Sequence, residues 1–473
     1  MKKLFSILIL LPILACSLTP NFTAPTAAPP TLVAASAPAK VEFTINVGAA
    51  DSASPIKPLL GVNMGPVPTG KAGNADLTSA YQQLGVNLIR THDFTGPFDL
   101  SAIYKDQNAD PANPSSYNFV ESDRVYDSIL KGGFELYLRV GNSYSNSQKV
   151  TNRDNLVKAM VEVVRHFNDE KRWGKKLRYV EIWNEPDNKQ FWLNDRAEFA
   201  PFFVQAAKAI KIALPEVKVG GPGFTPAGAL SPQGQQFTND LLNQLQKEKV
   251  QMDFFSWHVY SNDPNDYAKA AVFYREALDK HGYTKTESHI SEWNTDTFDR
   301  SQQGGKVEVP DAVTLRASGK ASAFTTAAWI ALQQNKVDAS TFYRGPDPDI
   351  NAPQFYGIFY ADGKPKPTAL AFKLWAKMAA HPTRLALTMN GGDPKSVWTL
   401  AGQNANGEIT ILIANISDKS SSWQIVPPSG KYTMTLEQVN DAVKDSIQTS
   451  VIKEPMANIG AYTVQLVTLT TQK

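Results

Sequence analysis

Short runs of β-branched and aromatic residues alternate with longer runs of helical periodicity along most of the chain. In 153–170, apolar residues recur at a spacing of three to four, as on one face of a helix: Leu156, Met160, Val163, Val164 and Phe167. The other predicted helices are 76–85, 122–133, 197–214, 236–248, 266–282, about 312–335 and 366–379. The predicted strands are 59–64, 86–92, 134–141, 178–184, 217–223, 252–260, 287–294 and 338–344.

Eight strands that alternate with eight helices predict an α/β fold, a (β/α)8 TIM barrel over 58–382. The alternative is an open doubly wound sheet, which usually carries a Gly-rich phosphate-binding turn after an early strand. The sequence contains no GxGxxG, GxxxxGK(S/T) or GxSxG motif. The pattern therefore favours the closed barrel.

The hydrophobic pattern changes after Pro382 to short alternating strands separated by turn residues, at 397–402, 408–416, 422–426, 432–439 and 461–470. This texture predicts a C-terminal antiparallel β-sandwich domain over 383–473. A further alternating run at 40–48 makes 40–57 a candidate for an additional strand of that sandwich.

The first residues have the pattern of an export signal. Lys2 and Lys3 precede an apolar run from Leu4 to Leu14 that is too short to span a bilayer. The Leu-Ala-Cys that ends at Cys16 resembles a bacterial lipobox, so 1–16 is interpreted as a lipoprotein signal peptide with lipidation of Cys16. An ordinary signal peptide with a chance cysteine is the alternative.

Residues 17–39 are rich in Pro, Ala and Thr and carry no charge, which predicts a disordered tether. We therefore expect an exported protein, lipid-anchored to the bacterial cell envelope, that meets the membrane only through this anchor. Cys16 is the single cysteine, so the chain has no intrachain disulfide. With 47 basic and 45 acidic residues, the formal net charge of +2 gives no electrostatic reason to expect a nucleic acid partner.

Polar residues gather where the predicted barrel strands end, which is where TIM barrels place their chemistry. They include Glu185 after the fourth strand and Glu292 in the seventh, which would face each other across the mouth of the barrel. Glycoside hydrolysis needs such a pair of carboxyl groups, one to protonate the leaving oxygen and one to attack the anomeric carbon or activate water. The sequence thus predicts a two-carboxylate site.

The motifs EIWNEPD (181–187) and HISEWN (289–294), with SWHVYS (256–261) between them and GKPKPTALAFKLW (363–375) after them, resemble those of clan A glycoside hydrolases. Within that clan the chain most resembles family 39, which includes β-xylosidases and α-L-iduronidases. The resemblance covers roughly 58–382, and a trailing β-sandwich is also usual there.

The resemblance implies that Glu185 is the acid/base and Glu292 the nucleophile of a retaining double displacement. Glu185 must be neutral when the sugar arrives, and both packing beside Trp183 and repulsion from ionised Glu292 are expected to raise its pKa. Arg90 and the Tyr260 hydroxyl are the expected stabilisers of ionised Glu292. Asn184 resembles the clan's amide that binds the sugar 2-hydroxyl.

The candidate substrate-binding residues are Asn184, Arg90, His92, His258, Tyr260, Trp293 and Tyr343. Alternative roles remain open for several of them: Arg90 as a structural partner of a barrel acid, His92 and His258 as core histidines, and Trp293 as barrel packing. No metal or other cofactor is expected, because the six histidines are scattered and there is no HExxH motif.

The resulting prediction is a retaining glycoside hydrolase that removes a β-linked sugar such as xylose from an oligo- or polysaccharide. Two alternatives remain open. One is an endo-acting enzyme, or one specific for arabinose or an exopolysaccharide, and the other is a non-catalytic glycan-binding surface lipoprotein. The sequence leaves the oligomeric state undecided.

Overall fold

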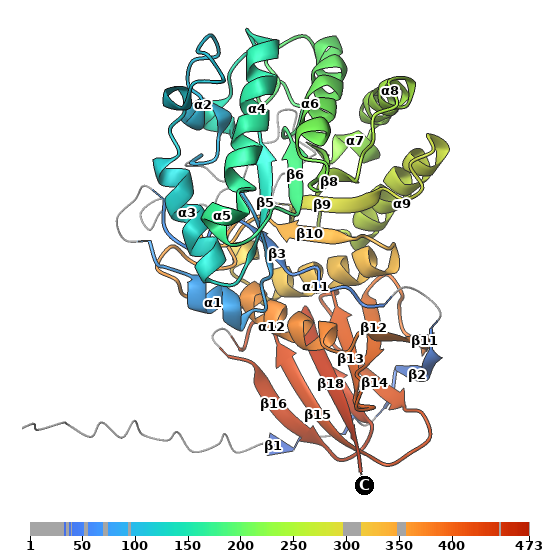
Figure 1. The fold of residues 1–473 in the computed structure, drawn as a ribbon. Coiled ribbons are helices and arrows are strands. Elements are labelled where there is room, and N and C mark those ends of the chain that lie inside the picture. Colours follow the sequence, from blue (N-terminus) through green and yellow to red (C-terminus); the bar gives the residue numbers. More distant parts are fainter. Residues whose placement is uncertain are drawn as a thin grey trace, which may run out of the picture.

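The computed structural model describes residues 33–34, 37–38, 40–51, 55–69, 74–92, 96–296, 314–347, 356–443 and 446–472. These residues form a closed parallel barrel and a β-sandwich that lies beside it (Figure 1). The predicted signal peptide and its Cys16 lie outside the described residues. No helix in the described ranges has both the length and the apolar character needed to cross a membrane.

The barrel closes in the strand order β10-β3-β4-β5-β6-β7-β8-β9, with neighbouring strands parallel. The strands are β3 Gly61–Asn63, β4 Leu88–Arg90, β5 Glu135–Val140, β6 Tyr179–Ile182, β7 Lys218–Phe224, β8 Phe254–Tyr260, β9 Glu287–Asn294 and β10 Ala339–Phe342. The closed barrel confirms the predicted fold class.

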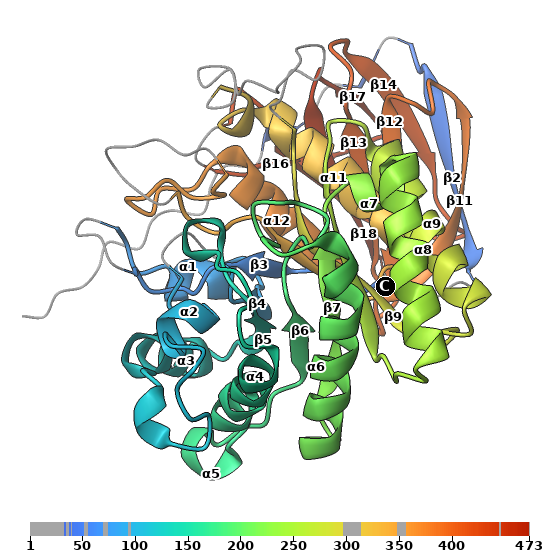
Figure 2. The same ribbon diagram turned by 90° about the horizontal axis from the view of Figure 1, so that it is seen from above.

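Helices cover the outside of the barrel, and Figure 2 shows α3, α4 and α6 alongside β5, β6 and β7. The long helices are α3 Val120–Lys131, α4 Arg153–Phe167, α6 Phe199–Ala213, α8 Pro232–Lys247, α9 Pro264–Lys280, α11 Gly319–Gln334 and α12 Pro367–Ala379. The short ones are α1 Thr78–Gln83, α2 Leu100–Ile103, α5 Glu170–Trp173 and α7 Ala227–Leu230.

Local signals in the sequence fix where several helices begin. The Asn152 side chain accepts a hydrogen bond from the Asn155 amide at the start of α4. Ser231 before Pro232 and Asp263 before Pro264 cap α8 and α9 in the same way, each with a proline in the first turn. A side-chain cap and an N-terminal proline both satisfy or remove an otherwise unpaired amide.

The barrel interior is layered. Its lower layer is a buried cluster of apolar and aromatic side chains, namely Leu88, Tyr137, Tyr179, Phe254 and Ala339. The His289 ring stacks on Phe254 in this layer, with ring centroids 4.4 Å apart. Two residues further along β4 and β6, Arg90 and Glu181 replace the apolar side chains and are fully buried. The upper half of the barrel is therefore polar, and every charge there needs a partner.

The sandwich contains the strands β2 Phe43–Ala50, β11 Thr383–Gly391, β12 Val397–Gln403, β13 Ile409–Asn415, β14 Ser421–Val426, β15 Tyr432–Val439, β16 Gln448–Ile452, β17 Met456–Ile459 and β18 Thr463–Thr471. Most neighbours are antiparallel, as predicted, but β2 pairs with β14 in parallel. The reason is that β2 enters the sheet from the start of the chain rather than through a hairpin.

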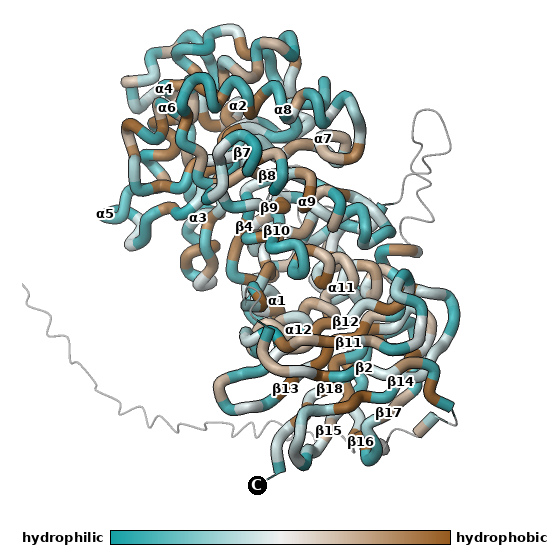
Figure 3. Tube along the Cα trace, turned by 90° about the vertical axis from the view of Figure 1, so that its right-hand side faces the viewer, coloured by the Kyte–Doolittle hydropathy of each residue, from teal (hydrophilic) through white to brown (hydrophobic). Residues whose placement is uncertain are grey.

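The strand β11 belongs to both faces of the sandwich. Thr383 and Arg384 pair with β12, and from Leu385 onward the strand pairs with β2, with an irregularity between Leu385 and Leu387. On the other side, α11 and α12 of the barrel contact β12, β13 and β18. Hydrophobic segments gather where these elements meet (Figure 3).

The expected disordered tether at 17–39 lies almost wholly outside the described residues. Within it, however, Val33–Ala34 forms a two-residue strand, β1, that pairs in parallel with Ser450 and Val451 of β16. For these two residues the expectation of disorder is wrong, because the open edge of β16 offers unpaired backbone groups. The sequence pattern also missed β11, β16 and β17.

The position of β2 generates the first prediction. Phe43, Ile45 and Val47 are buried in the sandwich core, and each stabilises the fold by about 1.5–3 kcal/mol. A chain that begins at residue 55 lacks β2, which leaves β11 and β14 without their shared neighbour. We expect its melting temperature to fall by on the order of 10 °C.

The control is a chain that begins at residue 40 and keeps β2. Thermal unfolding followed by circular dichroism compares the two chains. Equal melting temperatures would contradict the role assigned to β2.

Candidate active site

Arg90, at the carboxyl end of β4, organises the base of the barrel mouth. Its Nε donates to Glu181 Oε2 at 2.6 Å, and its Nη1 donates to Glu292 Oε1 at 2.7 Å and to Asn63 Oδ1 at 3.0 Å. Its Nη2 donates to Asn184 Oδ1 at 2.7 Å. Burial opposes the charge, but the neighbouring carboxylates of Glu181 and Glu292 raise the pKa of Arg90 further, so it remains a cation.

The chain turns sharply after β6 and presents Glu185 to the mouth. Trp183 and Glu185 have positive φ angles of 75° and 44°, in a region that non-glycine residues occupy only where the surroundings hold them. Those surroundings are visible: the Glu185 amide donates to the Gly223 carbonyl, and the Asn188 amide donates to the Glu185 carbonyl. The strand β6 ends at Ile182, two residues before the predicted end at 184.

Burial sets the protonation state of Glu185. Its side chain is only 12% exposed, and this burial raises its pKa to about 7, against smaller lowering effects from Asn188 and Arg90. The raised pKa was expected, and burial is its main cause, whereas the expected repulsion from Glu292 is not among the causes of the shift. The Trp183 indole packs against Trp192 and donates to the Phe191 carbonyl. Glu185 can therefore be neutral near pH 6 and can act as a proton donor.

Glu292 lies opposite in β9, with hydrogen-bond donors on both carboxylate oxygens. Arg90 binds Oε1, and the Tyr260 hydroxyl donates to Oε2 at 2.9 Å. The His92 Nε2 lies 3.4 Å from Oε1. These donors hold the Glu292 side chain in place at the mouth of the barrel.

The His258 ring lies between the two glutamates. Its Nδ1 is 3.0 Å from Glu185 Oε1 and 3.7 Å from Glu292 Oε2, and one oxygen of each glutamate and this nitrogen all lie within 4.8 Å of one another. Burial lowers the pKa of His258, so the ring is neutral at neutral pH. No more than 4.8 Å separates one oxygen of Glu185 from one oxygen of Glu292, which leaves little room for the water that inverting glycosidases place between their carboxyl groups.

The same three groups are also close enough to be considered for a metal ion. Both oxygens of Glu292 are already occupied by Arg90 and Tyr260, however, and the nearby guanidinium would repel a cation. We assign the cluster to proton transfer. The expectation that the site needs no metal stays a prediction.

The structure brings most of the candidate residues to this mouth. His92 and Tyr343 lie beside each other, with ring centroids 6.2 Å apart, and Tyr343 lies 6.4 Å from Tyr260. The Asn184 Nδ2 is buried and has no hydrogen-bond partner among the described residues. Because Arg90 occupies its Oδ1, this amide is fixed with its donor side available.

Trp293 is the exception, and its interpretation as a sugar platform is wrong. The side chain is fully buried, its Nε1 donates to Ser340 at 2.8 Å, and its ring packs edge-on against Trp329 and Phe342. Side chains alternate across a strand, so the residue after an inward-facing Glu292 points outward toward the helices.

Sequence reasoning missed four residues that shape the site: Asn63, Glu181, Asn188 and Asp187. Glu181 could have been found, since it lies two residues after Tyr179 and must face the same side of β6. Asp187 accepts hydrogen bonds from the Thr225 amide and hydroxyl, and burial, together with nearby Glu185, raises its pKa to about 6. It ties the loop that carries Glu185 to the loop after β7.

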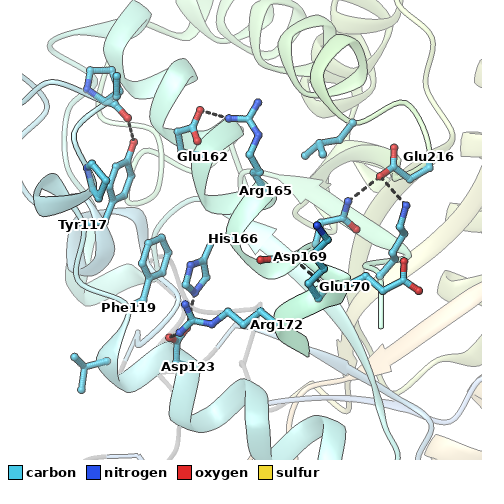
Figure 4. A pocket seen from close by; sticks show the side chains of 18 residues that line it. Tyr117, Phe119, Asp123, Glu162, Arg165, His166, Asp169, Glu170, Arg172 and Glu216 are labelled. Carbon is cyan, nitrogen blue, oxygen red and sulfur yellow. Dashed lines mark hydrogen bonds and ion pairs between the residues drawn. The ribbon is translucent and has the colours of Figure 1, made fainter. Parts of the chain in front are cut away.

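A separate hollow of about 980 Å³ lies on the outer side of the barrel, lined by residues of α3, α4 and α5. Figure 4 shows that its charges pair with one another: Asp123 contacts His166 and Arg172, and Glu162 contacts Arg165. Phe119 stacks on the His166 ring at 3.6 Å. The described lining residues thus offer no opposed pair of carboxyl groups, and this hollow is not the candidate active site.

The parallel barrel, with one glutamate at the carboxyl end of β6 and another at that of β9, places the protein among barrels that carry a two-carboxylate site. A match to a protein-family model narrows this class to one family. The model for glycosyl hydrolases family 39 matches residues 43–292, and the chain belongs to this family.

Two curated relatives are β-xylosidases. The protein of Geobacillus stearothermophilus is 26% identical over 235 residues, which are 44% of this chain and 45% of the relative. The protein of Caldicellulosiruptor saccharolyticus is 26% identical over 205 residues, 40% of this chain and 39% of the relative. The matched region thus spans less than half the length of each.

Solved structures extend the likeness over almost the whole chain. A glucosidase from Croceicoccus marinus has a TM-score of 0.71 at 22% identity, and the match covers 92% of this chain and 100% of the glucosidase chain. A monomeric β-xylosidase from Caulobacter crescentus has a TM-score of 0.67 at 16% identity, with coverage of 91% and 100%. At these identities the likeness establishes the shared fold.

The burial of Glu185 generates a prediction about stability. Folding raises its pKa from 4.5 to about 7, so its contribution to stability is full below pH 4.5 and is lost as the pH rises through 7. Replacing it by a neutral amide, as in Glu185→Gln, removes this pH dependence. We expect the wild type to lose about 3 kcal/mol relative to the variant over that interval.

Urea unfolding of both proteins from pH 4 to pH 8 measures this difference. Asp187 titrates in both proteins, so its own contribution largely cancels. If the free energies of unfolding of the two proteins change with pH in the same way, Glu185 is not buried as described.

Proposed function

We propose that the protein is a retaining glycoside hydrolase that cleaves β-linked sugars, with β-xylosides as the favoured substrates. The observation that carries the proposal is the pair Glu185 and Glu292, a neutral acid opposite a carboxylate held by Arg90 and Tyr260. Membership of family 39 supports the reaction class, and the two β-xylosidase relatives support the choice of sugar.

In the first step, a Glu292 oxygen attacks the anomeric carbon while the bond to the leaving oxygen breaks. Glu185 gives its proton to that oxygen, so the leaving group departs as a neutral alcohol. The product is a glycosyl ester on Glu292, and Glu185 becomes a carboxylate.

In the second step, Glu185 takes a proton from water as the water oxygen attacks the anomeric carbon. The ester bond breaks, Glu292 regains its charge, and the sugar leaves with its original anomeric configuration. Neutral His258 at 3.0 Å from Glu185 can accept a hydrogen bond from the acid or donate one to the carboxylate, according to its tautomer.

Asn184 is the proposed contact for the sugar hydroxyl beside the anomeric carbon. Arg90 fixes its oxygen, which leaves Nδ2 as a donor without a protein partner. A buried donor that lacks a partner costs free energy until a ligand supplies one, so it favours a substrate with an acceptor there. The non-catalytic alternative is disfavoured because both carboxyl groups of the pair are in place.

The first test is a screen of residues 40–473 against aryl β-xylosides, β-glucosides, β-galactosides and α-L-arabinosides, followed by NMR of the first product anomer. We expect turnover of the β-xyloside with retention. Inversion would exclude Glu292 as the nucleophile, and no turnover of any glycoside would reject the proposed function.

Substitution separates the two roles. Glu292→Gln should lower kcat/KM at least about 1,000-fold for every substrate, because the nucleophile is lost. Glu185→Gln should lower kcat/KM by a similar factor for glycosides with alkyl leaving groups. With a 2,4-dinitrophenyl glycoside the variant should slow release of the leaving group far less, because 2,4-dinitrophenolate departs without a proton. Glu162→Gln, in the outer hollow, is the control and should keep wild-type rates. Equal sensitivity of both site variants to the leaving group would contradict the assignment.

We also propose that the protein is exported and held at the cell envelope through a lipid on Cys16. The lipobox-like Leu-Ala-Cys and the uncharged segment that follows support this location. In a bacterial host, Cys16→Ser should abolish incorporation of labelled fatty acid and release the protein from the membrane fraction. Continued membrane attachment of the variant would reject the anchor.

A further inference from the structure

Arg90 binds two carboxylates in the barrel, and only one of them reacts. Glu181 lies on its Nε side at 2.6 Å, and Glu292 lies on its Nη1 side at 2.7 Å. The side chains of Arg90 and Glu181 are both 0% exposed, and that of Glu292 is 6% exposed. A guanidinium is a rigid planar fork, so a partner that fixes Nε also fixes the direction of both Nη groups.

We propose that Glu181 is a positioning residue for the reaction: it aims the Arg90 guanidinium at Glu292 and Asn184, and it remains the counter-charge of Arg90 while Glu292 is bonded to the sugar. The inference rests on the proposed function. Glu181 touches Arg90 rather than the reacting atoms, so it acts through that residue.

The charge balance of the two steps explains the need for a second carboxylate. In the free enzyme Arg90 faces two negative charges, on Glu181 and Glu292, while Glu185 is neutral. When the glycosyl ester forms, the charge of Glu292 is lost and the proton of Glu185 leaves with the alcohol. Without Glu181, the buried guanidinium would then have no carboxylate in contact, a costly state in a site of low polarity.

The surroundings of Glu181 contain no other cation that contacts it among the described residues. The titratable groups that face it are Arg90 from β4, Tyr137 from β5, and His258 and His289 from β8 and β9. Burial lowers the pKa of both histidines, so they are neutral at neutral pH. Burial opposes the charge of Glu181, but the Arg90 cation, with smaller contributions from Ser256, His258 and Ser291, lowers the pKa of Glu181 overall.

The groups around the reacting pair are equally defined. Glu292 is faced by Arg90, His92, His258 and Tyr260, and Glu185 by Arg90, Asp187, Asn188 and His258. Arg139 and Arg344 act on His92, whose pKa burial holds well below its usual range. Arg139 has its own carboxylate, Asp99, at 2.6 Å. Glu181 and Glu292 are thus the two carboxylates that balance Arg90.

Glu181→Gln therefore has a distinctive expected effect. Removing one negative charge exposes Glu185 and Glu292 to the undivided charge of Arg90, which favours the ionised form of both. Both limbs of the pH profile of kcat/KM should move to lower pH, by about one unit. A loss of packing alone would lower the rate without moving both limbs in the same direction.

The two chemical steps should also respond differently. Attack by Glu292 becomes slower, because its charge is held more strongly and the ester leaves Arg90 unpaired. We expect single-turnover release of 4-nitrophenol from 4-nitrophenyl β-D-xyloside to fall about 100-fold, the size expected when a catalytic group is mis-set by about 1 Å. Hydrolysis of the ester should change much less, because it restores the partner of Arg90.

Two further variants complete the experiment. Glu181→Asp keeps the charge but shortens the side chain, so it should keep the wild-type limbs of the pH profile while slowing the first step. Glu287→Gln removes a carboxylate at the other end of β9, where it contacts Lys218 and His289. It should keep both the limbs and the rate of the first step, even if its melting temperature falls.

Circular dichroism first establishes that each variant is folded. A folded Glu181→Gln protein with unshifted limbs would overturn the inference, although wild-type turnover would leave the proposed function standing. If Glu181→Gln does not fold, Glu181→Asp decides: wild-type limbs with a slower first step support the inference, and shifted limbs or a wild-type rate overturn it. If the wild type itself turns over no glycoside, the proposed function fails, and the inference fails with it.

Discussion

The upper half of the barrel depends on one buried cation. Arg90 can stay charged without solvent only because Glu181, Glu292, Asn63 and Asn184 receive its donors. Each of these partners comes from a different strand or strand end, so the guanidinium ties β3, β4, β6 and β9 together at the level where the chemistry is placed. The same contacts that remove an unpaired charge also fix Glu292, the proposed nucleophile, and the Asn184 amide, the proposed sugar contact. The same contacts of Arg90 therefore stabilise the barrel interior and order the side chains of the site.

The two glutamates of the candidate site have the same side chain but different surroundings. Glu292 has a guanidinium and a phenol as hydrogen-bond donors on its oxygens. Glu185 has an amide and a neutral imidazole, and its burial dominates. Two carboxyl groups beside the same histidine nitrogen thus have different surroundings, as the proposed double displacement requires.

The sandwich is joined to the barrel at both ends of the catalytic region. The chain passes through β2 before it enters the barrel and returns to β11 directly after α12, and these two strands pair over most of their length. This pairing therefore brings the chain that enters the barrel next to the chain that leaves it. Helices α11 and α12 cover the sandwich strands and bury the seam between the two domains.

The sequence by itself determined the order and type of the barrel elements, because periodicities of two and of about 3.6 residues are local properties of a chain. It also identified Glu185 and Glu292 as candidate site residues, since a polar residue at the end of a buried strand differs from its apolar neighbours. It could not assign β11 and β16, which bury few of their residues, or β17, which has only four residues. It also could not assign β1, whose partner edge belongs to β16.

Only the tertiary structure decided which side chains pack together and which charges meet. It packed Trp293 against Trp329 and Phe342, and it placed Glu181 on the Nε of Arg90. It also decided that burial is the main cause of the raised pKa of Glu185. The physical reason is that desolvation and ion pairing depend on everything around a group, which is assembled from strands distant in the chain.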